Sequence, residues 1–258
     1  MTTPIVLLVL LVGCDAPTPT ETSPPTLESQ TLLTLQRFYE DDASEQLDTL
    51  IDLVADEVGE DAGGFYFDAL EPEDVEMFEH SDAAIWEHTT GCAVFSKMRG
   101  TVADYAKSVP EPDQSFPDPS YQLWTREITG GTEADFLAGG DLDTWNQIEK
   151  DGVGFSVAYG MHKDYRWHGD TLAMISLVPE GEQPADAFST ELVVGFTIEL
   201  WTPIDGTMVW YNGSWTEIES PLDEDAVEIE GWLDLLIAGT IDYFEGTETH
   251  VMGEEVVE

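Results

Sequence analysis

The sequence predicts a single α+β domain in which helices precede and follow a curved antiparallel sheet of about six strands. Three observations favour this fold: apolar residues at helical spacing in the first part, alternating strands joined by tight turns in the middle, and a long amphipathic helix near the end. The chain has 258 residues, 42% of them hydrophobic, which is enough for one large core. A lipocalin-like barrel is the alternative fold.

The helical part begins at about residue 31. In its second predicted helix the apolar residues recur at intervals of three and four positions, at Leu47, Leu50, Ile51, Val54 and Val58. This spacing places them on one helical face, which is expected to pack on the sheet. Further along, at residue 72, a proline followed by two acidic residues is typical of the first turn of a short third helix.

The clearest strand covers residues 153–167, where the side chains of odd and even positions differ strictly in character. Gly169-Asp170 predicts a two-residue turn into a strand at residues 171–178, with Trp167 opposite Leu172. Earlier strands are expected at residues 93–102 and 121–129, and a short helix at residues 141–150.

A second hairpin is predicted around Asp205-Gly206, because this dipeptide favours the tight turn between two antiparallel strands. The flanking strands cover residues 192–202 and 207–215. This register places Trp201 opposite Trp210.

The last predicted helix covers residues 224–244 and is expected to lie across the sheet. Strands followed by such a helix, over residues 92–245, resemble the helix-grip folds that enclose apolar ligands. The resemblance is one of topology and no motif accompanies it, so it says little about function. It implies a carrier of a small apolar ligand in a cavity between sheet and helix. Residues 247–258 are interpreted as an acidic, flexible tail.

Residues 5–12 form an apolar run that is too short to span a bilayer but has the length found in signal peptides. The run ends in Leu11-Val12-Gly13-Cys14, which resembles the lipobox of bacterial lipoproteins. The resemblance implies that residues 1–13 are removed and that Cys14 carries a diacylglycerol and an acyl chain such as palmitate. One departure is that the first four residues include neither Lys nor Arg.

The segment that follows Cys14 is rich in Pro and Thr, and residues 14–30 are interpreted as an extended tether for a domain at residues 31–246. The expected location is therefore the bacterial cell envelope, with export and a lipid anchor in the membrane. Whether the inner or the outer membrane holds the anchor stays open.

The charge of the chain excludes two classes of partner. There are 8 Lys and Arg against 54 Asp and Glu, which gives a formal net charge of -46. Binding to nucleic acid depends on neutralising phosphates, and adsorption to anionic lipids depends on basic clusters, so neither is expected. An excess of acid with few lysines resembles proteins of salt-adapted bacteria.

Searches for catalytic motifs find none. The sequence contains no phosphate-binding loop, no nucleophile elbow and no pair of histidines at the spacing of a zinc site. The protein is therefore interpreted as non-catalytic, with no cofactor and no metal. Cys92, left without a partner if Cys14 is lipidated, is interpreted as a small buried hydrophobe.

Two sets of residues are candidates for binding. The first is the even face of the strand at residues 153–168, which is either a solvated outer face or the wall of a ligand cavity, and comprises Gly154, Ser156, Ala158, Gly160, His162, Asp164, Arg166 and His168. The two histidines are six residues apart along a strand, roughly 20 Å, which is too far for a shared metal ion. The second set is Trp201 and Trp210, which either pack the sheet or form an exposed pair that binds a partner.

These observations lead to two hypotheses of function. The first is a membrane-tethered, non-catalytic envelope lipoprotein with a partner-binding or structural role. The alternative is a carrier of a small apolar ligand between sheet and helix.

We predict that the folded state weakens at low ionic strength, because salt screens the repulsion among so many carboxylates. The melting temperature should therefore rise between dilute buffer and molar sodium chloride, and an unchanged value would rule this out. Stabilisation by millimolar calcium but not by matched sodium would instead indicate loose binding of divalent cations.

Overall fold

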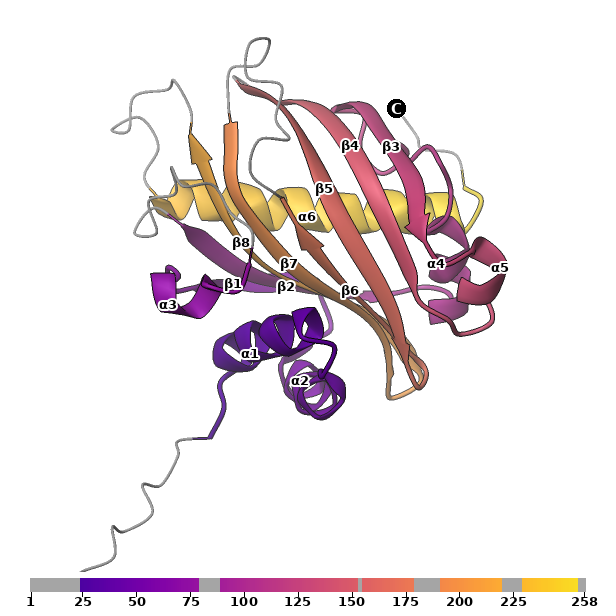
Figure 1. Cartoon of the computed structure of the whole chain (residues 1–258), viewed down its shortest axis with the longest axis horizontal. Coiled ribbons are helices and arrows are strands. Elements are labelled where there is room, and N and C mark those ends of the chain that lie inside the picture. The colour runs from indigo at the N-terminus through magenta and orange to yellow at the C-terminus, as the bar shows by residue number, and fades with distance from the viewer. Residues whose placement is uncertain (1–23, 79–88, 153–154, 179–190, 220–228, 255–258) are drawn as a thin grey trace, which may run out of the picture.

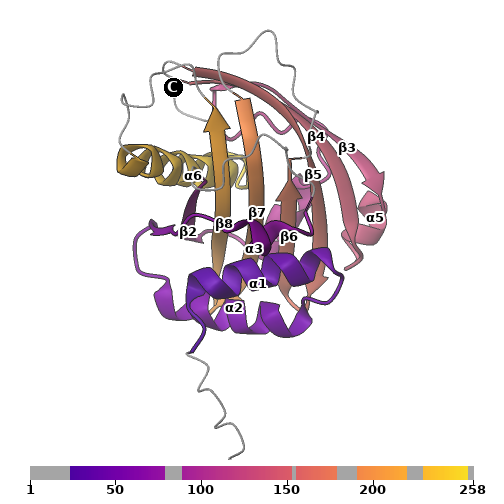
Figure 2. The ribbon, with the colours of Figure 1, turned by 60° about the vertical axis from the view of Figure 1, so that its left-hand side comes forward.

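A curved antiparallel sheet lies between two layers of helices (Figures 1 and 2). The computed structural model describes residues 24–78, 89–152, 155–178, 191–219 and 229–254. The predicted signal peptide, Cys14, most of the tether and Gly154 lie outside these residues, so the lipid anchor stays a prediction.

The sheet has eight strands, and every neighbouring pair is antiparallel. The strands are β1 (Gly63–Phe67), β2 (Thr90–Met98), β3 (Tyr121–Gly130), β4 (Leu142–Gly152), β5 (Phe155–His168), β6 (Thr171–Leu177), β7 (Glu191–Ile204) and β8 (Thr207–Glu219). Their order is β1-β2-β8-β7-β6-β5-β4-β3, so β3 to β8 form a meander and the β1–β2 hairpin is added beside β8. Because β1 and β3 are separate edges, the sheet is open, and the barrel alternative is wrong.

The helices divide between the two faces of the sheet. One face carries α1 (Leu27–Tyr39), α2 (Ser44–Glu57) and α3 (Pro72–Val75), and the other carries α4 (Val102–Ser108), α5 (Glu133–Phe136) and α6 (Ile229–Val251). Figure 1 shows α6 crossing behind the sheet, and Figure 2 shows α1 and α2 in front of β6, β7 and β8. The α+β fold with N-terminal helices and a long C-terminal helix on the sheet is thus confirmed. None of the helices in the described ranges is long and apolar enough to cross a membrane.

Alternation along the central strands gives the protein two cores. On β7, Phe196, Ile198 and Leu200 join the core beneath α1 and α2, whereas Trp201 joins the core beneath α6. Cys92 lies in the second core as a free, buried thiol, and burial raises its pKa, as expected of an inert side chain.

Both predicted hairpins have the expected turn and register. Trp167 pairs with Leu172 across the turn at Gly169, whose φ is 60°. Trp201 pairs with Trp210 across Asp205-Gly206, where both φ angles are positive.

Three expectations are corrected. Residues 142–152 form β4 rather than a short helix. The sequence conceals the alternation of this strand, because Thr144 and Asn146 are polar although their side chains are buried. Helix α1 begins at Leu27, capped by Thr26, which lies within the predicted tether. Helix α6 continues past residue 246 to Val251, and Thr247 is buried, so the ordered domain extends into the predicted tail.

We predict that Gly160→Ala lowers the free energy of unfolding by about 1–3 kcal/mol, as expected for overpacking. A Cβ atom at this position in β5 would lie 2.2 Å from the Cζ2 atom of Trp145. The matched control is Gly239→Ala in α6, where no atom lies within 4 Å of the added Cβ. Urea unfolding should show the control to be at least as stable as wild type, because alanine favours a helix. Equal stability of both variants would contradict the packing of Trp145 on Gly160.

Candidate functional site

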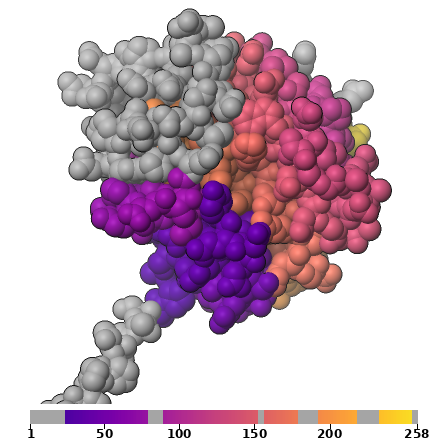
Figure 3. All heavy atoms as spheres, in the orientation of Figure 1, coloured from indigo at the N-terminus to yellow at the C-terminus, as the bar shows by residue number. Residues whose placement is uncertain are grey.

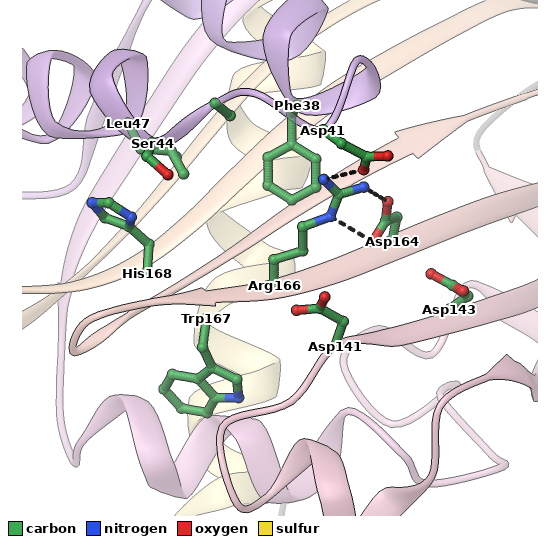
Figure 4. Close-up of a pocket in the computed structure, with 11 residues that line it drawn as sticks. Phe38, Asp41, Ser44, Leu47, Asp141, Asp143, Asp164, Arg166, Trp167 and His168 are labelled. Carbon is green, nitrogen blue, oxygen red and sulfur yellow. Dashed lines mark hydrogen bonds and ion pairs between the residues drawn. The ribbon is translucent and has the colours of Figure 1, made fainter.

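An open groove of about 630 Å³ lies between the α1–α2 corner and strands β4 and β5 (Figure 4). In Figure 3 the surface of α1 and α2 borders that of the strands on this side. Three residues of the predicted even face of β5 line this groove, namely Asp164, Arg166 and His168. The sequence analysis did not identify the residues that complete it, which are Phe38, Asp41, Ala43, Ser44, Leu47, Asp141, Asp143 and Trp167.

Arg166 occupies the centre of the groove. Its Nη1 lies 2.6 Å from Oδ1 of Asp41, and its Nη2 lies 2.5 Å from Oδ2 of Asp164. The guanidinium carbon lies 4.5 Å from the centre of the Phe38 ring. Arg166 thereby connects β5 to the α1–α2 turn, where Asp41 has a φ of 62°. Burial raises the pKa of Asp164, an effect that the neighbouring Arg166 opposes.

The rest of the groove is acidic. His168 Nε2 lies 2.7 Å from Oδ1 of Asp48 on α2. Asp141 and Asp143 belong to no ion pair with any residue that the structure describes. Four aspartates thus face one arginine and one histidine, so the groove suits a cationic group.

The other residues of the predicted even face lie away from the groove. Trp145 of β4 fills the space beside Gly160, and its ring centre lies 4.6 Å from that of His162. Gly160 therefore accommodates a side chain of the protein and offers no room to a ligand. Ala158 is buried and Ser156 is half-buried. The described part of the even face, from Ser156 to His168, points away from α6, because Tyr165, at an odd position, packs in the core beneath that helix.

Trp201 and Trp210 are neighbours but not a surface pair. Their ring centres are 5.0 Å apart, and their exposed fractions are 5% and 1%. Trp210 also stacks on Phe244 of α6, at 4.3 Å between ring centres. Both rings therefore pack inside the core beneath α6, as the packing interpretation expects, and the interpretation of an exposed partner-binding pair is corrected.

A second, smaller pocket of about 20 Å³ lies beneath α6, and we call it the α6 pocket. Its lining includes Tyr105, Arg126, Lys163, Trp201 and Tyr243. Arg126 and Lys163 are 7% and 5% exposed. The sequence held one signal of this site, since Lys163 stands among apolar residues on the packing face of β5.

Glu199 of β7 provides the negative charge nearest to Lys163. Lys163 Nζ lies 3.8 Å from Oε1 of Glu199 and 5.2 Å from the centre of the Trp124 ring. The other carboxylate oxygen of Glu199 accepts a hydrogen bond from Trp210 Nε1 at 2.8 Å. Burial lowers the pKa of Lys163 to about 8, and Glu199 opposes this shift.

Two residues that line the α6 pocket carry a buried polar atom without a hydrogen-bond partner. Among the described residues, neither Tyr105 Oη nor Trp201 Nε1 makes a hydrogen bond, although both atoms are buried. Burial raises the pKa of Tyr105, so its hydroxyl stays protonated at neutral pH. The part of the chain that the structure describes contains no cluster of three residues suited to holding a metal ion.

No protein-family model and no curated protein matches this chain. Solved structures that resemble it include a STAR-related lipid transfer protein from Xanthomonas axonopodis, with 9% identity, a TM-score of 0.46 and coverage of 68% of this chain and 99% of that one. The human StarD13 lipid transfer and protein localization domain has 9% identity, a TM-score of 0.44 and coverage of 78% and 95%. The Zhui aromatase/cyclase from Streptomyces sp. R1128 has 10% identity, a TM-score of 0.42 and coverage of 64% and 94%. Likeness at this level does not establish what the present chain binds.

We predict a rise in stability between about pH 8 and pH 10.5 that depends on Lys163. Its pKa is about 8 in the folded state against 10.5 for the free side chain, so in this window the unfolded state binds more protons. Below pH 8 the folded state bears the whole free-energy cost of burying the charged amine. As the pH rises the amine loses its proton, and the free energy of unfolding increases by at most about 3 kcal/mol.

The measurement compares urea unfolding of wild type and Lys163→Met across this window. Titration of Cys92 and of the tyrosines contributes equally to both proteins and cancels in the difference. The difference in unfolding free energy should change in favour of wild type as the pH rises, and a difference independent of pH would contradict the buried, titrating amine.

Proposed function

We propose that this protein binds a small, mainly apolar ligand between the concave face of its sheet and α6. The observation that carries the proposal is the pair of unpartnered polar atoms, Tyr105 Oη and Trp201 Nε1, inside a layer of aromatic side chains. A buried polar group without a hydrogen bond costs about 1–3 kcal/mol, so a layer with only a packing role gains nothing from two of them. A ligand with electronegative groups would give these atoms hydrogen-bond partners.

The aromatic side chains of this layer would contact the apolar body of the ligand. Trp210, Tyr243 and Phe244 form a continuous set of ring contacts, with centres between 4.3 and 6.2 Å apart. Ligand sites of this kind are lined mainly by apolar and aromatic groups, with a few polar groups that fix the orientation of the ligand.

Helix α6 is held by polar contacts near both of its ends, which favours movement of its middle. Near its N-terminal end, Tyr66 Oη donates a hydrogen bond to Asp234 Oδ1 at 2.5 Å. Its C-terminal end is fixed by Arg99, which contacts Glu248 at 2.9 Å and Glu254 at 2.7 Å, and by His250, which contacts Glu111 at 3.0 Å. Along its middle the apolar side chains are only partly buried, namely Leu236, Ile237 and Ile241. Because the α6 pocket has only about 20 Å³, the ligand would replace these partial contacts as the middle of α6 separates from the sheet.

The open groove favours a second candidate function, the binding of a basic segment of a partner. Asp141 and Asp143 lie there without a described ion pair, and a lysine or arginine of a partner would neutralise them. This candidate keeps the hypothesis of a tethered, partner-binding envelope lipoprotein, with the groove rather than the two tryptophans as the contact surface.

To test ligand binding, the full chain is titrated with N-phenyl-1-naphthylamine, a neutral apolar dye that becomes fluorescent when it leaves water. We expect saturable binding of one dye per chain. Ile241→Trp should raise the Kd of the dye at least tenfold, because the larger ring fills the space between α6 and the sheet.

The matched control is Leu235→Trp, on the same helix but at a side chain that is 61% exposed, and its Kd should equal that of wild type. Absence of saturable binding would reject the proposal, and so would equal dye affinity in the two tryptophan variants.

A further inference from the structure

Arg126 is exceptional among the basic residues of this chain. Within the described ranges, seven of the eight basic side chains form at least one ion pair with a carboxylate, and Arg126 forms none. The chain offers 54 acidic residues, so a carboxylate partner for Arg126 is not scarce. Arg126 is nevertheless only 7% exposed, and a buried charge is costly unless it is paired.

The contacts of Arg126 are all neutral. Its Nε donates to Oδ1 of Asn146 at 2.8 Å, and its Nη1 donates to the backbone carbonyl of Val109. Its guanidinium carbon lies 5.5 Å from the centre of the Tyr165 ring. Nη2 donates to no residue in the described part of the chain. The guanidinium is thus held in place with its positive charge uncompensated.

Arg126 borders the α6 pocket together with Trp201 and Tyr105, the two lining residues that carry an unpartnered polar atom. The Trp201 side chain is only a donor, and the protonated hydroxyl of Tyr105 is able to donate as well. Lys163 adds a second positive charge, which Glu199 balances at 3.8 Å. The groups around the pocket therefore require an acceptor, and the uncompensated charge of Arg126 favours a negative one.

The size of the α6 pocket limits the size of the group that it can bind. A volume of about 20 Å³ is enough for one water molecule or one single-atom ion. A carboxylate is larger than either, and it would fit after a small displacement of the lining side chains.

We propose that the α6 pocket is a binding site for one small anionic group, held by Arg126 with Trp201. The anion is either a free halide or the carboxylate of the bound ligand; the second source rests on the function proposed above. A carboxylate would meet the planar guanidinium, whose free N–H groups match its oxygens. The ligand class is then an apolar acid rather than an alcohol or a hydrocarbon.

Two arms of one experiment, both on the full chain, distinguish these sources. In the first, chloride replaces isethionate, a bulkier anion, at constant ionic strength, and the melting temperature is measured. A free halide site predicts a rise of several degrees that saturates with chloride and is absent in Arg126→Gln. Arg37→Gln, at an exposed ion pair, is the matched control and should keep the rise.

In the second arm, decanoate and decanol compete with N-phenyl-1-naphthylamine for the protein. A carboxylate site predicts that decanoate displaces the dye at a concentration at least tenfold lower than decanol does. Arg126→Gln should abolish this preference, Arg126→Lys should retain part of it because the charge remains, and Arg37→Gln should leave it unchanged.

The outcomes separate the two proposals. If wild type shows neither a chloride effect nor a preference for decanoate, the anion site is rejected, while dye binding still supports the apolar ligand. If the dye does not bind, the proposed function is rejected, and the chloride arm still decides the anion site. A chloride effect or a preference for decanoate that persists unchanged in Arg126→Gln would also overturn the assignment. Should Arg126→Gln not fold, Arg126→Lys replaces it in both arms and should reduce each effect.

Discussion

Burial of both faces of the sheet is the constraint on which the rest of this structure depends. Side chains alternate along a strand, so β7 sends Ile198 and Leu200 towards α1 and α2, and Glu199 and Trp201 towards α6. A sheet covered on one side only would have left one of these sets in water. Two helical layers are therefore necessary, and both the groove and the α6 pocket lie where these layers meet the outer strands β3 to β5.

The scarcity of basic residues gives each of them an identifiable role. Arg99 fixes the C-terminal end of α6 through two carboxylates, and Arg166 joins β5 to the α1–α2 turn through two more. Arg99 is exposed, and ion pairs at such positions contribute little to stability individually. Their value here is in position, because they set where α6 and the α1–α2 corner meet the sheet. Arg126 differs because no carboxylate of the described chain meets it, although it lies deeper than either.

The parts of the fold that the sequence predicted are those encoded by local patterns. The turns at Gly169 and Asp205-Gly206 set the register of two hairpins, and the helical spacing from Leu47 to Val58 identified α2. Strand β4 was missed because Thr144 and Asn146 are polar and yet fully buried, which a hydrophobic pattern does not represent. Three of the eleven residues that line the groove were predicted, because Asp164, Arg166 and His168 share one strand face. Asp41 and Asp141 come from segments that only the tertiary fold brings together.

Strand β5 separates two sites of opposite charge. Its even positions give Asp164 and Arg166 to the groove, where aspartates outnumber basic groups, and its odd positions give Lys163 and Tyr165 to the α6 pocket, where the basic groups outnumber the one acid. The chain has a net charge of -46, so the electrostatic field of the whole protein attracts a cation to the groove. The same field repels an anion that enters the α6 pocket. An anion in the α6 pocket must therefore be held by close contacts with a fixed guanidinium and by exclusion of water, because long-range attraction opposes it. This requirement explains why Arg126 is anchored by Asn146 and by the carbonyl of Val109 rather than by a carboxylate, which would cancel the charge that the anion needs.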